Sequence, residues 1–158
     1  DIRLGRWMVN IGTAEEAALN VPDAIDAPFR PDFDMTRVLD IGDTVVAKIV
    51  DIDRRRTPIL SILGRGLGRV NEGFLMRFTP SKIPRLIGKK GSMVNMILNH
   101  TGCNVVIGQN GRILIHGRTR EREAMAVKVI TKVENEAHIP GLTSRVQEYL
   151  RMLKEEKR

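Results

Sequence analysis

The stretch LIGKKGSMV, residues 86–94, decides how this sequence of 158 residues folds. Its two glycines, Gly88 and Gly91, allow the backbone to turn sharply and leave no side chain to keep a phosphate group from the main chain. A helix is expected to begin at about Ser92, so that its free N–H groups and positive dipole end point at the loop. The two lysines between the glycines add positive charge at the same place. The stretch therefore predicts a clamp for a phosphate backbone.

A glycine–lysine run of this kind has two other interpretations. The phosphate-binding loop of nucleotide-hydrolysing enzymes requires G-x-x-x-x-G-K-[ST] after a strand. No glycine stands five residues before Gly88, and Lys89 is followed by Lys90 rather than by serine or threonine. The sequence therefore excludes a nucleotide-phosphate loop. A plain turn between helices, with exposed lysines, remains an alternative when the loop is considered alone.

Strand and helix patterns alternate around the loop. Asn110-Gly111 between two apolar runs is typical of a type I′ hairpin. Thr119 followed by Glu121 and Glu123 is typical of the start of a helix. The expected elements are a strand at 73–79, a short helix at 81–86, a helix at 92–100, strands at 104–107 and 112–115, a helix at 119–137 and a last helix from about 144. This β-α-loop-α-β-β-α order, with an added C-terminal helix, predicts an α+β domain.

The first half of the sequence has the pattern of a small β structure. Residues 6–11 alternate with period two, and residues 44–51 (TVVAKIVD) are rich in β-branched side chains. Further strands are expected at 17–21 and 59–62, and residues 22–37, with three prolines, predict a loop that has room for one helical turn. Short strands at this spacing indicate a small all-β barrel.

Charge and composition divide along the same line. Residues 1–72 contain 10 Lys and Arg against 12 Asp and Glu, whereas residues 73–158 contain 16 against 7. The positive charge, which favours a polyanionic partner, therefore lies in the second half. The sequence has one cysteine, Cys103, so an intramolecular disulfide is excluded. A chain with so little cysteine fits a reducing, cytoplasmic compartment. We expect Cys103 to be a small core residue. No apolar run approaches the roughly 20 residues of a membrane span. Because the chain begins at Asp1 without methionine, we expect its natural N-terminus to lie upstream.

The second half resembles a KH domain of the type I arrangement over residues 71–137. The resemblance rests on the order of elements and on Ile87 before and Val94 after the glycine loop. It implies that the loop holds the backbone of about four nucleotides while the bases lie in an apolar groove. By resemblance, that groove would be lined by Ile87, Val94, Ile97, Leu98 and the edge of the strand at 104–107.

The first half resembles the OB barrel repeated in ribosomal protein S-one. The matching pieces are the segments 5–9, 16–21 and 41–53 and the closing Leu60-Ser61. The usual first strand is absent, and the exposed aromatic pair on which such barrels stack bases is not evident. Trp7, the only tryptophan, is either a core residue or a contact. The candidate contacts of the barrel are basic: Arg6, Arg30, Lys48, Arg54, Arg55 and Arg56.

Together the halves resemble the RNA-binding cap subunit of the archaeal exosome, most strongly over residues 64–68 and 79–93. The expected organisation is an OB-like barrel at 1–63 without its first strand, a glycine-rich joint at 64–72, and a KH domain with a C-terminal helical extension at 73–158. The resemblance implies a cytoplasmic, non-catalytic subunit that binds single-stranded RNA. Three copies would cap a hexameric ring of RNase-PH-like subunits and feed it RNA 3′ ends. Its expected RNA-binding residues in the KH half are Arg85, Ile87, Gly88, Lys89, Lys90, Gly91, Ser92 and Val94.

Two other function classes share some of these features. A transcription elongation and termination factor of the NusA type also places an OB barrel before KH units, but that family has two KH units of the other topology. An autonomous nuclease would need an acid or histidine constellation. His100, His116 and His138 are scattered, and the pairs Asp32/Asp34 and Asp51/Asp53 fall in or beside turns. We therefore expect no catalytic residue, metal or cofactor.

Overall fold

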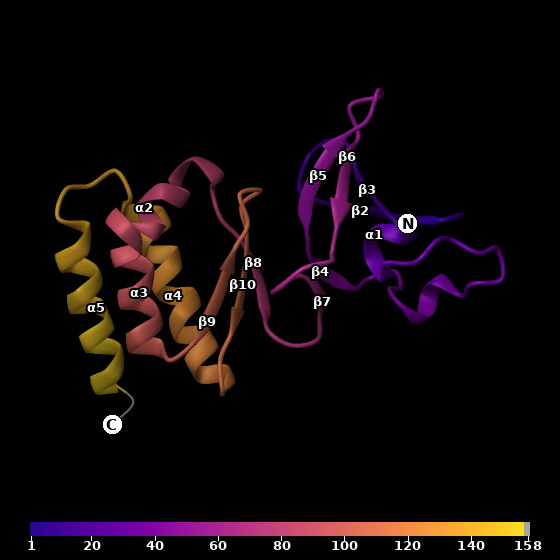
Figure 1. The fold of residues 1–158 in the computed structure, drawn as a ribbon. Helices are drawn as coiled ribbons and strands as arrows, with labels where there is room; N and C mark the ends of the chain where they lie inside the picture. Colours follow the sequence, from indigo (N-terminus) through magenta and orange to yellow (C-terminus); the bar gives the residue numbers. More distant parts are fainter. Residues whose placement is uncertain (157–158) are drawn as a thin grey trace. The chain divides into compact units, whose positions relative to one another are not determined.

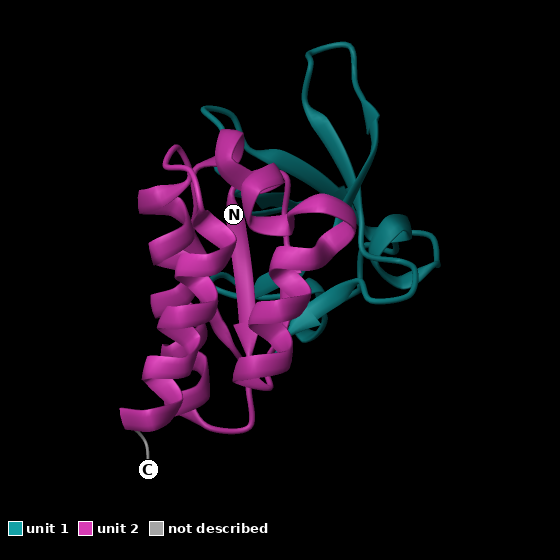
Figure 2. Cartoon of the chain, turned by 90° about the vertical axis from the view of Figure 1, so that its left-hand side faces the viewer, with its two compact units in different colours: residues 1–71 teal, residues 72–158 magenta. Residues whose placement is uncertain are grey.

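The structure of the protein, a computed structural model, describes residues 1–156 as two compact units. The first unit is Asp1–Asn71 and the second begins at Glu72 (Figure 2). The first is built mainly from strands, whereas the second combines a sheet with helices (Figure 1). The expected mixed fold, an OB-like barrel followed by a KH-like α+β unit, is therefore confirmed.

The first unit contains one large and one small sheet. The large sheet has the strand order β1-β2-β3-β6-β5, in which β3 and β6 run parallel and the other neighbours antiparallel. The small sheet pairs β4 with β7. The elements are β1 (Ile2–Arg3), β2 (Arg6–Val9), β3 (Ala17–Asn20), α1 (Val21–Ile25), the 3-10 helix η1 (Met35–Arg37), β4 (Thr44–Val46), β5 (Lys48–Ile52), β6 (Pro58–Ser61) and β7 (Gly68–Val70).

The core of the first unit forms around the single tryptophan. Trp7 is 3% exposed and packs with buried aliphatic residues that include Leu19 and Leu60. Its indole Nε1 donates a hydrogen bond of 2.9 Å to the main-chain oxygen of Leu39. Burial of the ring with its one polar atom paired is the usual state of a core tryptophan. Of the two roles left open for Trp7, the structure shows the core role.

The structure differs from the sequence expectations at three places in this unit. The strand expected at 44–51 is two strands separated at Ala47, because the first part pairs with β7 and the second with β6. Residues 68–70, expected within a flexible joint, form β7, and the division between units falls after Asn71. A two-residue strand, β1, lies beside β2 where no first strand was expected. At 22–37 the structure agrees with the prediction of a loop with room for a helical turn: the short helix α1 begins there, and a proline occupies an early helical position that tolerates its missing N–H.

The second unit is a three-stranded sheet with helices. All of its strands pair antiparallel in the order β8-β10-β9. Its elements are β8 (Phe74–Arg77), η2 (Pro80–Lys82), α2 (Ile83–Ile87), η3 (Lys89–Gly91), α3 (Ser92–Thr101), β9 (Asn104–Ile107), β10 (Arg112–His116), α4 (Arg120–Glu136) and α5 (Leu142–Glu156). The order expected from the sequence is confirmed, including the C-terminal helix.

The core of the second unit lies between the sheet and its helices (Figure 1). Ile113 and Ile115 of β10 are fully buried, whereas the alternate residues of that strand face the other way. From α4, Val129 and Val133 enter the same core, and α5 adds further aliphatic residues. Each such side chain contributes about 1.5–3 kcal/mol on burial. An almost wholly aliphatic core thus holds the helix–loop–helix segment of residues 83–101 in place.

No helix in residues 1–156 combines the length and the apolar character that crossing a membrane would require.

Candidate nucleic-acid interface

The loop between α2 and α3 has an unusual backbone path. Gly88 adopts φ 74° and ψ 178°, Lys90 φ 54° and ψ 31°, and Gly91 φ 78° and ψ 11°. Three of four consecutive residues therefore have positive φ, a region that L side chains rarely occupy. The chain turns within these four residues and then enters α3. This geometry explains why both ends of the GKKG segment are glycine.

The two glycines are required for different reasons. A Cβ at Gly88 would lie 2.7 Å from Met93 Cβ and 2.8 Å from Met93 N, so position 88 has no room for a side chain. At Gly91 the nearest atom to such a Cβ would be Asn95 Nδ2 at 3.4 Å, so only the left-handed conformation disfavours a side chain there. Gly88 thus allows the loop to close onto α3, and Gly91 starts the helix.

Positive charge converges on the loop. Lys89 and Lys90 are both exposed, and neither forms an ion pair with any residue between 1 and 156. No side chain caps the N-terminal turn of α3, a helix of ten residues. The dipole of such a helix places partial positive charge at its N-terminus. The loop therefore joins two available ammonium groups to an uncapped helix N-terminus, which suits a phosphate group.

The helix before the loop is fastened to the end of α4. Arg85 Nε donates a hydrogen bond of 3.0 Å to the main-chain oxygen of Ala137. Lys82 Nζ donates one of 2.9 Å to the main-chain oxygen of Glu134, whose carboxylate accepts a 2.8 Å bond from Thr79 N. Cations near a helix C-terminus stabilise its free carbonyls and its dipole. Arg85, predicted as an RNA contact, thus also has a structural partner, and Lys82 and Glu134 were not singled out from the sequence.

The apolar groove expected beside the loop is only partly as predicted. Ile87, Val94 and Leu98 are half-buried, whereas Ile97 is 1% exposed and belongs to the core. The prediction for Ile97 is wrong because α3 is turned so that Met93 and Ile97 face the sheet and the other helices. The strand at 104–107, β9, is an edge strand of its sheet, as expected. Ser92 is exposed at the start of α3.

The basic candidates of the first unit lie on separate elements. Arg6 begins β2 and Lys48 begins β5, and both are exposed. Arg54, Arg55 and Arg56 occupy the exposed turn between β5 and β6, at the end of a hairpin (Figure 1). The structure thus gathers the three turn arginines but not the others.

Arg30 lines an open pocket of about 510 Å³ that also includes Phe33 and Arg37. Asp34 is on the same rim, and its hydrogen bonds from Thr36, together with Arg37, lower the pKa of its carboxyl group. The carboxylate therefore stays ionised at neutral pH and offsets part of the arginine charge. A pocket of mixed charge is a weaker attraction for phosphate than the GKKG loop.

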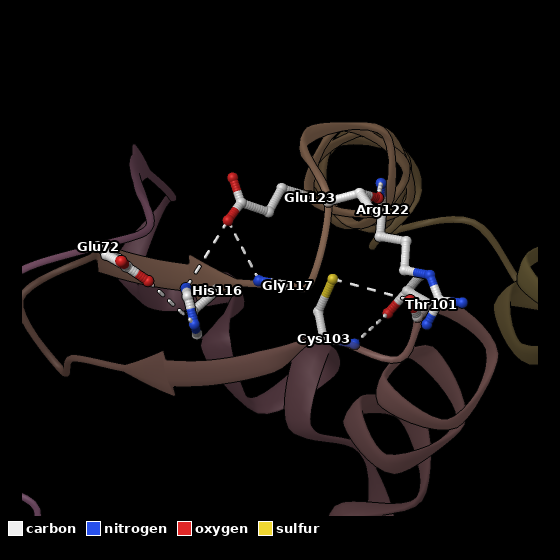
Figure 3. A network of polar contacts seen from close by, with 8 residues as sticks. Glu72, Thr101, Cys103, His116, Gly117, Arg122 and Glu123 are labelled. Atoms are coloured by element: carbon white, nitrogen blue, oxygen red, sulfur yellow. Dashed lines mark hydrogen bonds and ion pairs between the residues drawn. The ribbon is translucent and has the colours of Figure 1, made fainter.

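A polar network lies at the far end of β10 (Figure 3). His116 Nδ1 is 3.8 Å from Glu123 Oε1, and its Nε2 is 3.8 Å from Glu72 Oε2. Glu123 also accepts a 3.2 Å hydrogen bond from Gly117 N. Cys103 nearby is 3% exposed, which confirms it as a small core residue. Across residues 1–156, no three His, Cys, Asp or Glu side chains are grouped so that they could hold a metal ion.

Comparison with known proteins agrees with this geometry. The family model described as the KH domain matches residues 73–121, which include the loop, α3, β9 and β10. The class defined by fold and loop is therefore that of KH-domain proteins with a preceding OB-like unit. Exosome complex component Rrp4 of Ignisphaera aggregans is 42% identical over 151 residues, covering 95% of this chain and 60% of that protein. Its counterpart from Thermococcus kodakarensis is 40% identical over 155 residues, with the same coverage.

A solved structure matches this chain over its whole length. It is described as an exosome complex RNA-binding protein, is 34% identical, and superposes with a TM-score of 0.94 over 100% of this chain and 91% of its own. The chain belongs to the Rrp4 family of exosome complex components. It spans about 60% of the length of the curated relatives named above. Family membership favours an exosome component over the NusA-type transcription factor that was the alternative.

Proposed function

We propose that this chain binds single-stranded RNA for an exosome and grips the RNA backbone at the Gly88–Gly91 loop. The observation that carries the proposal is the loop itself. It has positive φ at Gly88, Lys90 and Gly91, and its two lysines, which have no ion-pair partner in residues 1–156, precede a helix without a side-chain cap. In this geometry the phosphate backbone of the RNA would be attracted at one place by main-chain N–H groups, by the dipole of α3 and by two ammonium groups. The resulting grip positions RNA without selecting its sequence.

The bases would lie beside the loop, between α3 and the edge of β9. Half-buried Ile87, Val94 and Leu98 offer an apolar surface, and the outer edge of β9 offers main-chain groups. KH domains hold about four nucleotides in this manner. Ser92 and Arg85 complete the predicted contact set. Arg85 can bind through its remaining guanidinium nitrogens while its Nε is held by Ala137.

The first unit would contribute a weaker, electrostatic contact. Trp7 is buried and so offers no stacking surface, although stacking on aromatic side chains is worth about 1–3 kcal/mol per base in other barrels. Arg54, Arg55 and Arg56 at the β5–β6 turn are the most concentrated charge of this unit, with Arg6, Arg30 and Lys48 on other elements. They would attract the RNA chain at a distance and bind it loosely.

The proposed role in the complex is supported by the family to which the chain belongs. The chain would act without catalysis in the cytoplasm, in three copies on a ring of RNase-PH-like subunits. It would pass RNA 3′ ends to that ring for degradation from the 3′ end. Membership in the Rrp4 family supports this role, and the sequence offers no catalytic constellation of its own.

The loop is tested by reversing its charge. Lys89→Asp with Lys90→Asp should weaken binding of a single-stranded oligonucleotide by about tenfold or more, because two charge-assisted phosphate contacts are lost. The slope of log affinity against log salt should fall by about 1.4 for two single-strand phosphates. The matched control is Lys128→Asp with Lys154→Asp, which makes the same change of net charge at exposed positions of the same unit. If both double variants bind alike, the loop is not the RNA site.

Two further measurements separate the function classes. The purified chain, incubated with labelled RNA in phosphate and Mg²⁺, should leave the RNA intact, and shortening of the RNA would contradict the non-catalytic role. Co-purification with RNase-PH-like ring subunits would support the exosome role. Co-purification with RNA polymerase would instead support the alternative function, a transcription elongation and termination factor of the NusA type.

A further inference from the structure

One face of the second unit's sheet is not covered by that unit's own helices. Strand alternation places Ile113 and Ile115 of β10 in the core and Leu114 on the opposite face. The register sets Leu114 between Leu75 of β8 and Val106 of β9. Leu75 is 46% exposed and Val106 43% exposed. These three side chains form an aliphatic row across the whole sheet, which we call the outer row.

Two arginines lie one step along the strands from the outer row. Arg77 of β8 and Arg112 of β10 are direct cross-strand partners, so their side chains leave the same face. Like charges placed directly opposite each other destabilise a sheet. Neither guanidinium has an ion-pair partner within residues 1–156. The pair is therefore an unneutralised concentration of positive charge beside an aliphatic surface.

The other end of the face carries different charge. His116 lies there at the end of β10, and the carboxylates of Glu72 and Glu123 are each 3.8 Å from its ring nitrogens (Figure 3). Along the strands the face therefore changes from two free arginines, through the outer row, to a histidine between two acids. A surface polarised in this way can accept a partner in only one favourable orientation.

The composition of the face indicates a protein rather than RNA. Sheet surfaces that bind single-stranded RNA use aromatic side chains to stack bases. The one aromatic residue of these strands, Phe74, is 48% exposed, but it pairs with Ile115 and therefore belongs to the face opposite the outer row. The cations are arginine, which is enriched in protein interfaces, whereas lysine, which is depleted there, is absent from these strands. In the same unit, the GKKG loop carries lysines.

We propose that the outer row, together with Arg77 and Arg112, binds another protein subunit of the exosome. The surface that the partner presents would be an aliphatic patch flanked by carboxylates. The inference rests on the proposed function, since it takes the partner from the same complex. Carboxylates of the partner would pair with the two guanidinium groups and remove the repulsion between them. Aliphatic side chains of the partner would cover Leu75, Leu114 and Val106. The docking face is separate from the loop that would hold RNA.

The test uses the full chain and an assembled ring of RNase-PH-like subunits from the same organism as the probe. Arg77→Glu with Arg112→Glu should weaken ring binding by at least about tenfold, since rim and buried charge pairs both contribute. The matched control, Arg118→Glu with Arg120→Glu, changes the same charge at exposed positions of the same unit and should bind the ring normally. Thermal melting of each variant shows whether the fold is intact, and an unfolded variant is replaced by Arg77→Gln with Arg112→Gln.

A second variant reports the contact directly. With p-benzoylphenylalanine in place of Leu114, ultraviolet light should cross-link the chain to one ring subunit. Equal ring binding by the arginine and control variants overturns the proposal, as does failure of the unaltered chain to bind the ring. Loss of oligonucleotide binding by the arginine variant with ring binding retained would make this face an RNA site and would also overturn it. Titration of the unaltered chain with an oligonucleotide tests the proposed RNA binding independently of the docking proposal.

Discussion

Gly88 and Met93 approach so closely that a Cβ on the glycine would lie 2.7 Å from the Met93 Cβ. Gly88 also has φ 74° and ψ 178°, a region that only glycine occupies readily. Gly88→Ala should therefore destabilise the second unit by about 2–4 kcal/mol, from backbone strain and overlap together. Gly91→Ala, whose Cβ would only touch Asn95 Nδ2 at 3.4 Å in the left-handed region, should cost only about 1–2 kcal/mol. Urea unfolding of both variants measures the difference, and equal losses would contradict this account of the loop.

Trp7 provides a prediction about the first unit. Because the ring is buried and Nε1 is bonded to Leu39 O, its fluorescence should be that of a buried indole. Saturating oligonucleotide should leave the emission unchanged, whereas a stacking contact would quench it. Trp7→Ala should destabilise the first unit by about 3–5 kcal/mol. Trp7→Phe, which loses the 2.9 Å hydrogen bond and part of the ring, should cost less, and the two variants serve as controls for each other.

Arg85 should act on both stability and RNA binding. Arg85→Ala removes the 3.0 Å bond to Ala137 O and should lower the free energy of unfolding of the second unit by about 1 kcal/mol. Arg85→Lys keeps the charge but loses the Nε donor, so it should retain more of the RNA affinity than of the stability. Paired urea unfolding and RNA titration measure the two effects. If Arg85→Ala changed RNA affinity alone, the bond to Ala137 would have no structural role.

Glu136 joins the ends of α4 and α5 and makes their packing sensitive to acid. Its carboxylate lies 2.6 Å from Lys132 Nζ and 3.1 Å from Arg145 Nε. The hydrogen bond from Lys132, followed by the charges of Lys132 and Arg145, lowers the pKa of Glu136 from its ordinary value of 4.5. A lowered folded-state pKa stabilises the fold above the unfolded value, and that stability is lost as the pH falls through the lowered value.

Thermal melting across the acid range should show this dependence. Glu136→Gln should lower the melting temperature at neutral pH. It should also make the further fall of the melting temperature below pH 4.5 smaller than in the unaltered chain. Glu155→Gln, at an exposed position of α5, is the matched control and should leave both unchanged. An identical acid dependence in both variants would mean that other carboxylates control it.

Local signals carried most of the sequence prediction for the second unit. Asn110-Gly111 marked the place of the β9–β10 hairpin, but the predicted type I′ turn is wrong, because Gly111 has positive φ and Asn110 does not. Thr119 marked the start of α4, where its side chain accepts from Arg122 N. Both signals act within a few residues, so a single sequence reveals them. The GKKG loop was predictable for the same reason.

Contacts between distant segments were not predictable in this way. The bond between Arg85 and Ala137 joins residues 52 apart, and nothing near either residue marks it. The unbroken run at 44–51 does not reveal that the chain changes sheets at Ala47, since pairing partners decide that. The burial of Ile97 depends on the rotation of α3, which helical periodicity fixes only to within about one neighbouring position.

Lys90 adopts φ 54° and ψ 31° in the middle of the loop. For a lysine this left-handed conformation costs about 1–2 kcal/mol, whereas asparagine tolerates it better. An asparagine at this position would therefore keep the path of the chain and remove one charge. Shape and charge can thus vary independently within these four residues. Related proteins from cells with different salt concentrations can therefore differ in RNA affinity while the fold of the domain stays the same.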